Sequence, residues 1–201
     1  MALNFANNNS LSSITALPAS ISGGGLNLIS TQTASSSSTI SFTSGIDSTY
    51  KEYIFKYYNV HPSTGASLYM NLSADGGSNY NVTKTSSAFR AFHQEDDGGA
   101  SITYLTGYDL AQGTGSQRIS GAINASNADE SCSGTLHLFD PSNTTFVKHF
   151  LITTSSSNYE DQIFNPYVAG YCNTTSAIDG VQFKMSSGNI DAGVIKLYGV
   201  S

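Results

Sequence analysis

The chain has 201 residues, which suits one domain or one domain with an arm. Its formal net charge is −6 with only 8 basic residues, too few to neutralise the phosphates of a nucleic acid. No apolar run approaches the length of a membrane span, and the first residues lack the basic start and continuous apolar core of a signal peptide. We therefore expect neither nucleic acid nor membrane as a partner, and we expect a protein that is assembled inside a cell.

The composition favours strands and turns over helices. Ser and Thr make up about a quarter of the chain, with 19 Gly and 4 Pro, whereas Glu, Lys and Arg are scarce. The 12 Tyr and 10 Phe provide large side chains for a core.

The start of the chain contains no ionisable side chain. From Met1 to Ile46 there is no Lys, Arg, Asp, Glu or His, although disordered tails usually resist collapse through charge. Apolar residues recur through this segment, so we expect it to lie along a surface of its own domain or of a neighbouring subunit. The predicted assembly arm covers residues 1–25 and ends at three glycines. Its candidate contact residues are Leu3, Phe5, Leu11, Ile14, Leu17 and Ile21.

Residues 26–201 are predicted to form an all-β domain, an antiparallel β-sandwich of the jelly-roll type. Period-2 alternation marks the strands: Tyr53, Phe55 and Tyr57 fall on one face and Lys56 on the other. Turn residues rich in Gly, Pro, Asp and Asn separate about ten short strands. The predicted strands are residues 26–32, 39–43, 53–58, 67–72, 87–92, 101–106, 134–139, 145–153, 166–171, 177–185 and 193–198.

Residues 107–131 form the least regular part of the predicted domain. They are rich in Gly, Ser, Asn and Ala, and a connection of this length is usually functional or packed against a neighbour. We expect a short helix over residues 109–112.

One dense acidic cluster, Glu95, Asp96 and Asp97, precedes two glycines. Clustered carboxylates suit Ca²⁺, but contiguous acids rarely converge on one ion, so a solvated hairpin tip is the favoured interpretation. The segment from Asp75 to Ser78 has the same two interpretations, and a turn is favoured there too.

The remaining reactive side chains indicate no catalytic residues, no metal site and no cofactor. The four histidines, His61, His93, His137 and His149, form no zinc pattern, although His137 and His149 would meet if their strands pair. No G-x-S-x-G elbow supports a serine hydrolase, and no pair of glutamates can be placed for glycoside cleavage.

Cys132 and Cys172 are the only cysteines. We expect two ordinary thiols in a reducing compartment rather than a disulfide framework.

Four tyrosines lie near predicted loops or strand ends. Aromatic faces at such places stack on sugars or fill subunit interfaces, although core packing is the commoner outcome. The candidate glycan or interface aromatics are Tyr104, Tyr108, Tyr159 and Tyr167.

The chain resembles structural proteins of tailed bacteriophages, especially marine ones. The stretches that carry the resemblance are residues 26–35 (LNLISTQTAS), 39–50 (TISFTSGIDSTY), 134–142 (GTLHLFDPS), 146–150 (FVKHF) and 188–199 (GNIDAGVIKLYG).

This resemblance implies a virion protein without enzymatic activity, assembled in the host cytoplasm. Head decoration is the expected role, since the repetitive shaft sequence typical of a fibre is missing. The alternative is a tail-fibre or host-surface glycan-binding module. The expected partners are capsid or tail proteins and further copies of the chain, in a homo-oligomer such as a trimer.

Overall fold

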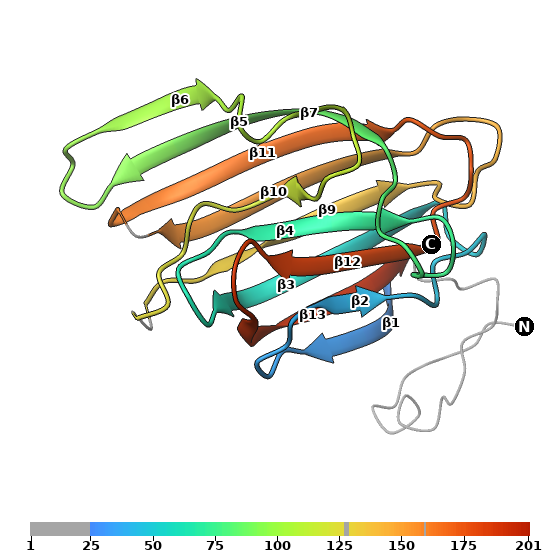
Figure 1. Cartoon of the computed structure of the whole chain (residues 1–201), viewed down its shortest axis with the longest axis horizontal. Coiled ribbons are helices and arrows are strands. Elements are labelled where there is room, and N and C mark those ends of the chain that lie inside the picture. Colours follow the sequence, from blue (N-terminus) through green and yellow to red (C-terminus); the bar gives the residue numbers. More distant parts are fainter. Residues whose placement is uncertain (1–24, 127–128, 159) are drawn as a thin grey trace, which may run out of the picture.

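The computed structural model describes residues 25–126, 129–158 and 160–201, and all regular structure in these residues is β-strand. Two antiparallel sheets pack face to face (Figure 1). The larger, nine-stranded sheet has the order β1-β13-β3-β9-β10-β11-β5-β6, and β7 also pairs with β5. The smaller sheet has the order β2-β12-β4-β8. The predicted all-β antiparallel sandwich is confirmed.

The described residues include no helix long and apolar enough to cross a membrane.

The strands of the larger sheet are β1 (Leu26–Thr33), β3 (Glu52–Pro62), β5 (Lys84–Gln94), β6 (Ala100–Tyr104), β7 (Leu110–Gly113), β9 (Cys132–Phe139), β10 (His149–Asn158), β11 (Gln162–Cys172) and β13 (Ile190–Val200). Those of the smaller sheet are β2 (Ile40–Phe42), β4 (Leu68–Ser73), β8 (Gln117–Arg118) and β12 (Gly180–Met185).

Every predicted strand is present, with shifted ends, but two strands were not predicted. β7 and β8 lie in the irregular region after residue 107. The helix predicted over residues 109–112 is wrong, because Leu110–Gly113 pairs with β5 instead: Leu110 lies opposite Ser86, and its N–H donates to Ser86 Oγ at 3.0 Å.

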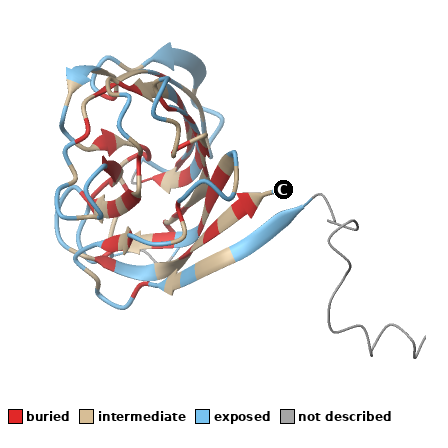
Figure 2. Ribbon diagram, turned by 90° about the vertical axis from the view of Figure 1, so that its right-hand side faces the viewer, coloured by how far each residue is buried: buried red, intermediate tan, exposed pale blue. Residues whose placement is uncertain are grey.

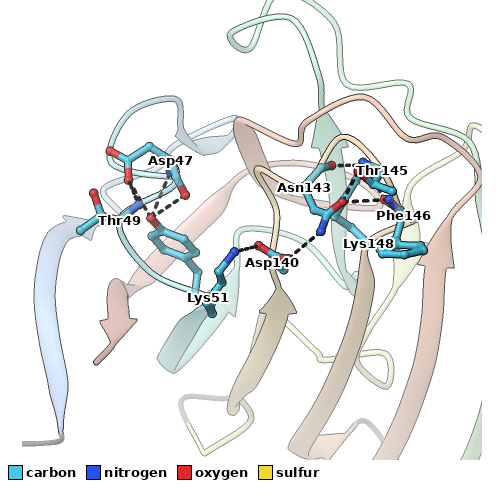
Figure 3. Close-up of polar contacts among 9 residues, drawn as sticks. Asp47, Thr49, Lys51, Asp140, Asn143, Thr145, Phe146 and Lys148 are labelled. Atoms are coloured by element: carbon cyan, nitrogen blue, oxygen red, sulfur yellow. Dashed lines mark hydrogen bonds and ion pairs between the residues drawn. The ribbon is translucent and has the colours of Figure 1, made fainter.

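The strand predicted over residues 145–153 begins only at His149, because local hydrogen bonds fold the preceding residues into a loop. Asn143 Oδ1 accepts from the backbone N–H groups of Thr145 and Phe146, each at 2.8 Å. Lys148 Nζ donates to the carbonyl oxygens of Asn143 and Phe146 (Figure 3). Beside this loop, Lys51 forms an ion pair of 3.0 Å with Asp140, which joins the loops that precede β3 and follow β9.

Aromatic side chains fill the space between the sheets. Tyr53, Phe55 and Tyr57 of β3 are fully buried, as their alternation predicted. The Phe55 ring meets Phe42 of β2 edge to face at 5.3 Å and lies 5.8 Å from Phe183 of β12. Figure 2 shows the buried segments lying between the two sheets.

The first strand of the described residues lies directly after Gly25. β1 begins at Leu26 and forms one edge of the larger sheet, where it pairs with β13. The arm residues Leu3, Phe5, Leu11, Ile14, Leu17 and Ile21 lie outside the described residues.

Candidate interaction surface

The larger sheet has two distinct faces. Tyr53, Phe55 and Tyr57 point toward the smaller sheet, whereas Lys56 between them points away. Residues that oppose one another in an antiparallel register share a face. The register therefore assigns the residues of each neighbouring strand to a face. We call the side turned away from the smaller sheet the outer face.

The outer face carries most of the exposed large apolar side chains. Ten such side chains are exposed in the described residues, and one of them, Phe146, lies in the loop before β10. The other nine lie on the outer face: Leu26, Leu28, Tyr58, Phe89, Ile102, Tyr104, Leu151, Ile163 and Tyr167.

Over five adjacent strands this face is also uncharged. Among the described outward-facing residues of β9, β10, β11, β5 and β6 there is no Asp, Glu, Lys or Arg. The next two strands of the sheet, β3 and β13, do carry charged side chains on the outer face: Glu52, Lys56 and Lys196. The face therefore combines exposed apolar side chains with Ser, Thr, Asn and His residues, and exposed apolar area of this kind makes it a candidate interaction surface.

A groove crosses the middle of this surface. Two adjoining hollows of about 370 and 250 Å³ share Ser87, Leu151 and Ala169, so they form one depression. We call it the aromatic groove. One wall is the Phe89 ring stacked on Tyr167, with centroids 5.0 Å apart and an interplanar angle of 11°. The residues of the opposite wall are His149 and Tyr171, whose rings lie 6.0 Å apart.

The groove follows from the order of large and small residues along β11 and β5. Tyr167, Ala169 and Tyr171 are consecutive outward residues of β11, so a methyl group lies between two phenol rings. On β5, Ser87 lies opposite Ala169. Small side chains on paired strands therefore form the floor.

The four predicted tyrosines have different surroundings. Tyr104 and Tyr167 are exposed on the outer face, and the Tyr104 hydroxyl donates to Asp109 at 2.8 Å, which raises the pKa of this tyrosine. Tyr159 lies outside the described residues.

Tyr108 belongs to the core and not to an exposed aromatic site. It is only 7% exposed, its hydroxyl donates to the Ser120 carbonyl at 3.1 Å, and burial raises its pKa to about 12. The Arg118 guanidinium lies 4.2 Å from its ring centroid, and Phe164 stacks on it at 6.1 Å.

Several residues of the surface were not predicted. They are Leu26, Leu28, Tyr58, Phe89, Ile102, Leu151 and Ile163. One feature of the sequence could have indicated this surface. A strand with one face in solvent alternates apolar and polar residues, but Phe150, Leu151 and Ile152 are three apolar residues in a row, so one of them must point outward.

The acidic cluster is the tip of the β5–β6 hairpin, as favoured from the sequence. Asp96 Oδ1 accepts the Gly98 N–H at 2.8 Å, and Asp97 is almost fully exposed. The Glu95 N–H donates to the Asp161 carbonyl at 2.9 Å, so the tip contacts the turn between β10 and β11.

The predicted turn at Asp75 is also present, where the Asp75 carboxylate accepts from the backbone and side chain of Asn79. In the part of the chain that the structure describes, no three His, Cys, Asp or Glu residues are grouped to hold a metal ion.

The histidines are separated. β9 and β10 do pair, but His137 lies opposite Leu151, and its Nδ1 is 2.5 Å from Glu52 Oε1. His149 contacts Tyr171, as described for the groove, and His93 lies 3.1 Å from Asp97.

Both cysteines are buried free thiols. Burial raises the pKa of Cys132 to about 12 and that of Cys172 to about 11. Lys84 lies opposite Cys172 on the inner face, and its Nζ donates to Asn71 Oδ1 at 2.6 Å and to the Val82 carbonyl at 2.7 Å.

Comparisons of the chain with protein-family models, with curated proteins and with solved structures find no match.

Proposed function

We propose that the protein is a non-enzymatic structural component of the virion of a tailed bacteriophage, where it decorates the exterior of the capsid. The sequence resemblance supports the virion setting. The observation that carries the proposal is the uncharged outer face of β9, β10, β11, β5 and β6 with its exposed apolar side chains. Such a surface suits a protein that is held among other proteins.

The chemistry of the surface favours contacts with protein. Phe89, Tyr167 and Tyr104 provide aromatic area, which is enriched in protein interfaces. Ile102, 78% exposed on an edge strand, adds an aliphatic anchor. In a symmetric shell each contact is repeated in many copies, so individually weak contacts suffice. The partners are capsid proteins and further copies of this chain, with assembly in the host cytoplasm.

Incorporation into particles tests this role. A phage that carries this sequence is complemented with wild-type protein, with Ile102→Glu, or with the matched control Thr103→Glu. Both residues are exposed on β6, but Thr103 lies on the opposite face of the sheet. We expect at least a tenfold loss of Ile102→Glu from purified particles, because a buried, unpaired charge costs several kcal/mol. The control is expected to be retained.

Deletion of residues 1–25 is the second arm of this experiment. We expect a folded domain that no longer joins particles, because the predicted assembly arm is missing. Normal incorporation of both the truncated protein and Ile102→Glu, measured by mass spectrometry of the particles, would contradict the proposal.

The alternative function is a tail-fibre or host-surface glycan-binding module. The exposed Tyr167 ring beside the hydroxyls of Ser87 and Thr153 favours it, since sugars stack on aromatic rings and hydrogen-bond to neighbouring hydroxyls. Tyr104 adds a second exposed ring on the same face, on the far side of Phe89. Saturable binding on a glycan array that Tyr167→Ala abolishes and Tyr58→Ala retains would support this role. Tyr58 is the control because it is similarly exposed on the same face, away from the groove. An array without binding would dismiss it.

A further inference from the structure

The register of the larger sheet connects the aromatic groove with the start of the described chain. Residues that oppose one another on successive strands form a row across the outer face. The row that includes the groove floor continues without interruption to β1. Its members are Ser87, Ala169, Leu151, His137, Ile54, Tyr198 and Leu28.

This row combines aliphatic with polar side chains, and its one ion-paired member is His137, which contacts Glu52. Ala169, Leu151, Ile54 and Leu28 are aliphatic and contribute no charge. Leu28 is exposed at the β1 end of the path, and Leu151 is exposed at the groove end. A polypeptide that crosses from β1 to the groove along this row meets Leu28, Ile54 and Leu151, with Tyr198 and His137 between them.

The chain that precedes β1 enters the sheet beside this path. Leu26 lies on the outer face opposite Val200, two residues before Leu28, and Gly25 accepts a hydrogen bond from the Ser201 N–H. Gly25, to which residues 1–24 are attached, therefore lies at the same edge of the sheet as Leu28, the β1 member of the row.

The length of residues 1–24 is sufficient to reach the groove. Six strand spacings separate Leu28 from Ser87, which is about 29 Å at about 4.8 Å per spacing. Twenty-four extended residues span about 80 Å. About nine of them cover the crossing, and the others remain available to fill the groove.

The chemistry of residues 1–24 matches that of the groove. The segment contains no ionisable side chain, and it carries Phe5 and Leu17 among its apolar residues. The groove has aromatic walls and a small, uncharged floor. Binding therefore buries apolar area on both sides and leaves no Lys, Arg, Asp or Glu unpaired. Attachment to the same chain also gives this segment a high effective concentration at the groove.

We infer that residues 1–24 bind the aromatic groove of the same chain. In this arrangement the segment covers the groove and its exposed residues Phe89, Leu151 and Tyr167 in the free protein. That this keeps free copies apart until they reach a particle rests on the proposed function, whereas the binding itself is measured on the free protein.

The absence of tryptophan from the sequence provides a direct test. Phe5→Trp and Leu17→Trp are made separately in the full chain, so that each variant has one fluorescent reporter. We expect at least one reporter to emit at short wavelength and to be protected from acrylamide, independently of protein concentration. Ala169→Glu, a charge on the groove floor, should shift that emission to the red and increase quenching several-fold.

The matched control is Ser155→Glu, which places the same charge on an exposed outward residue of β10 outside the groove. It should leave the emission unchanged. If Ala169→Glu does not fold, Leu151→Asn at an exposed position of the groove takes its place.

The inference is overturned if both reporters emit as free tryptophan, or if the groove variant changes the emission of neither reporter. A blue shift that disappears on dilution would assign the groove to a second copy and would also overturn binding within one chain. None of these results depends on particle incorporation.

Discussion

At the scale of single residues, the least expected feature is a lysine in the interior. Lys84 is fully buried, and its ammonium group is held by one side-chain amide oxygen and one carbonyl oxygen. Burial lowers the pKa of Lys84 from 10.5 to about 8, while the neighbouring Cys172 acts in the opposite direction. Among the described residues, no carboxylate accepts a hydrogen bond from the Lys84 ammonium group. The charge of this group near neutral pH therefore lowers the free energy of unfolding.

This residue makes the stability of the protein dependent on pH. Between pH 8 and 10.5 the unfolded chain binds a proton at Lys84 that the folded chain has released, so this lysine's contribution to stability rises with pH. Relative to Lys84→Met, the free energy of unfolding of the wild type should increase by up to about 3 kcal/mol across that window. Because both proteins share all other titrating groups, their difference isolates this lysine together with its interaction with Cys172.

Denaturant unfolding of the two proteins at pH 7.5, 9 and 10.5 measures this difference. A constant difference at the three pH values would show that Lys84 titrates normally in the folded protein.

The tyrosines illustrate which single-residue roles were not predictable. Tyr104 and Tyr108 are four residues apart and both lie near strand ends, yet one is exposed and the other is in the core. The difference depends on Arg118 and Phe164, which cover the Tyr108 ring from distant parts of the sequence. No local pattern around residue 108 contains that information.

At the scale of elements, β6 is an unprotected sheet edge. All five of its residues are exposed, and its sequence from Ala100 to Tyr104 contains no charge and no proline. Natural edge strands usually carry such features to prevent pairing with another chain. We therefore expect β6 to contribute to self-association at high concentration.

The variant Ile102→Lys tests this property of β6. We expect sedimentation velocity at increasing concentration to show less self-association than in the wild type, with a melting temperature within a few degrees because the side chain is exposed. Thr103→Lys, on the other face of the same strand, adds the same charge and should reduce self-association less than Ile102→Lys does. Equal association of the wild type and Ile102→Lys would indicate that this face of β6 is not involved.

The strands were largely predictable because period-2 alternation is a local signal. Leu136 and Leu138 of β9 alternate with His137, and the structure buries the two leucines. β7 and β8 were missed because they have only four and two residues, and they are strands through their pairing with β5 and β4.

The aromatic groove could not be predicted for a related reason. It needs Ala169 of β11 to lie opposite Leu151 of β10 and Ser87 of β5. β10 and β11 are consecutive strands, but β5 lies far from β11 in the sequence, so its register with β11 is not a local signal. The large-small-large order of Tyr167, Ala169 and Tyr171 is visible in the sequence, but its orientation away from the core is not.

At the scale of the whole molecule, the two sheets have different surroundings. The smaller sheet and the inner face of the larger sheet bury the core between them, whereas the outer face carries apolar side chains that no described residue covers. In the proposed role, the core between the two sheets stabilises the domain, and the outer face contacts the particle or neighbouring copies.

The position of the protein on the particle tests this role most directly. An electron-microscopy reconstruction of the phage that carries this sequence should show the domain on the capsid exterior, in the copy number of a shell component. In this reconstruction, the outer face of β10, β11, β5 and β6 should be covered by capsid protein or by adjacent copies of the chain. A domain present in only a few copies at the tail, or one whose outer face is turned to solvent in every copy, would contradict the account.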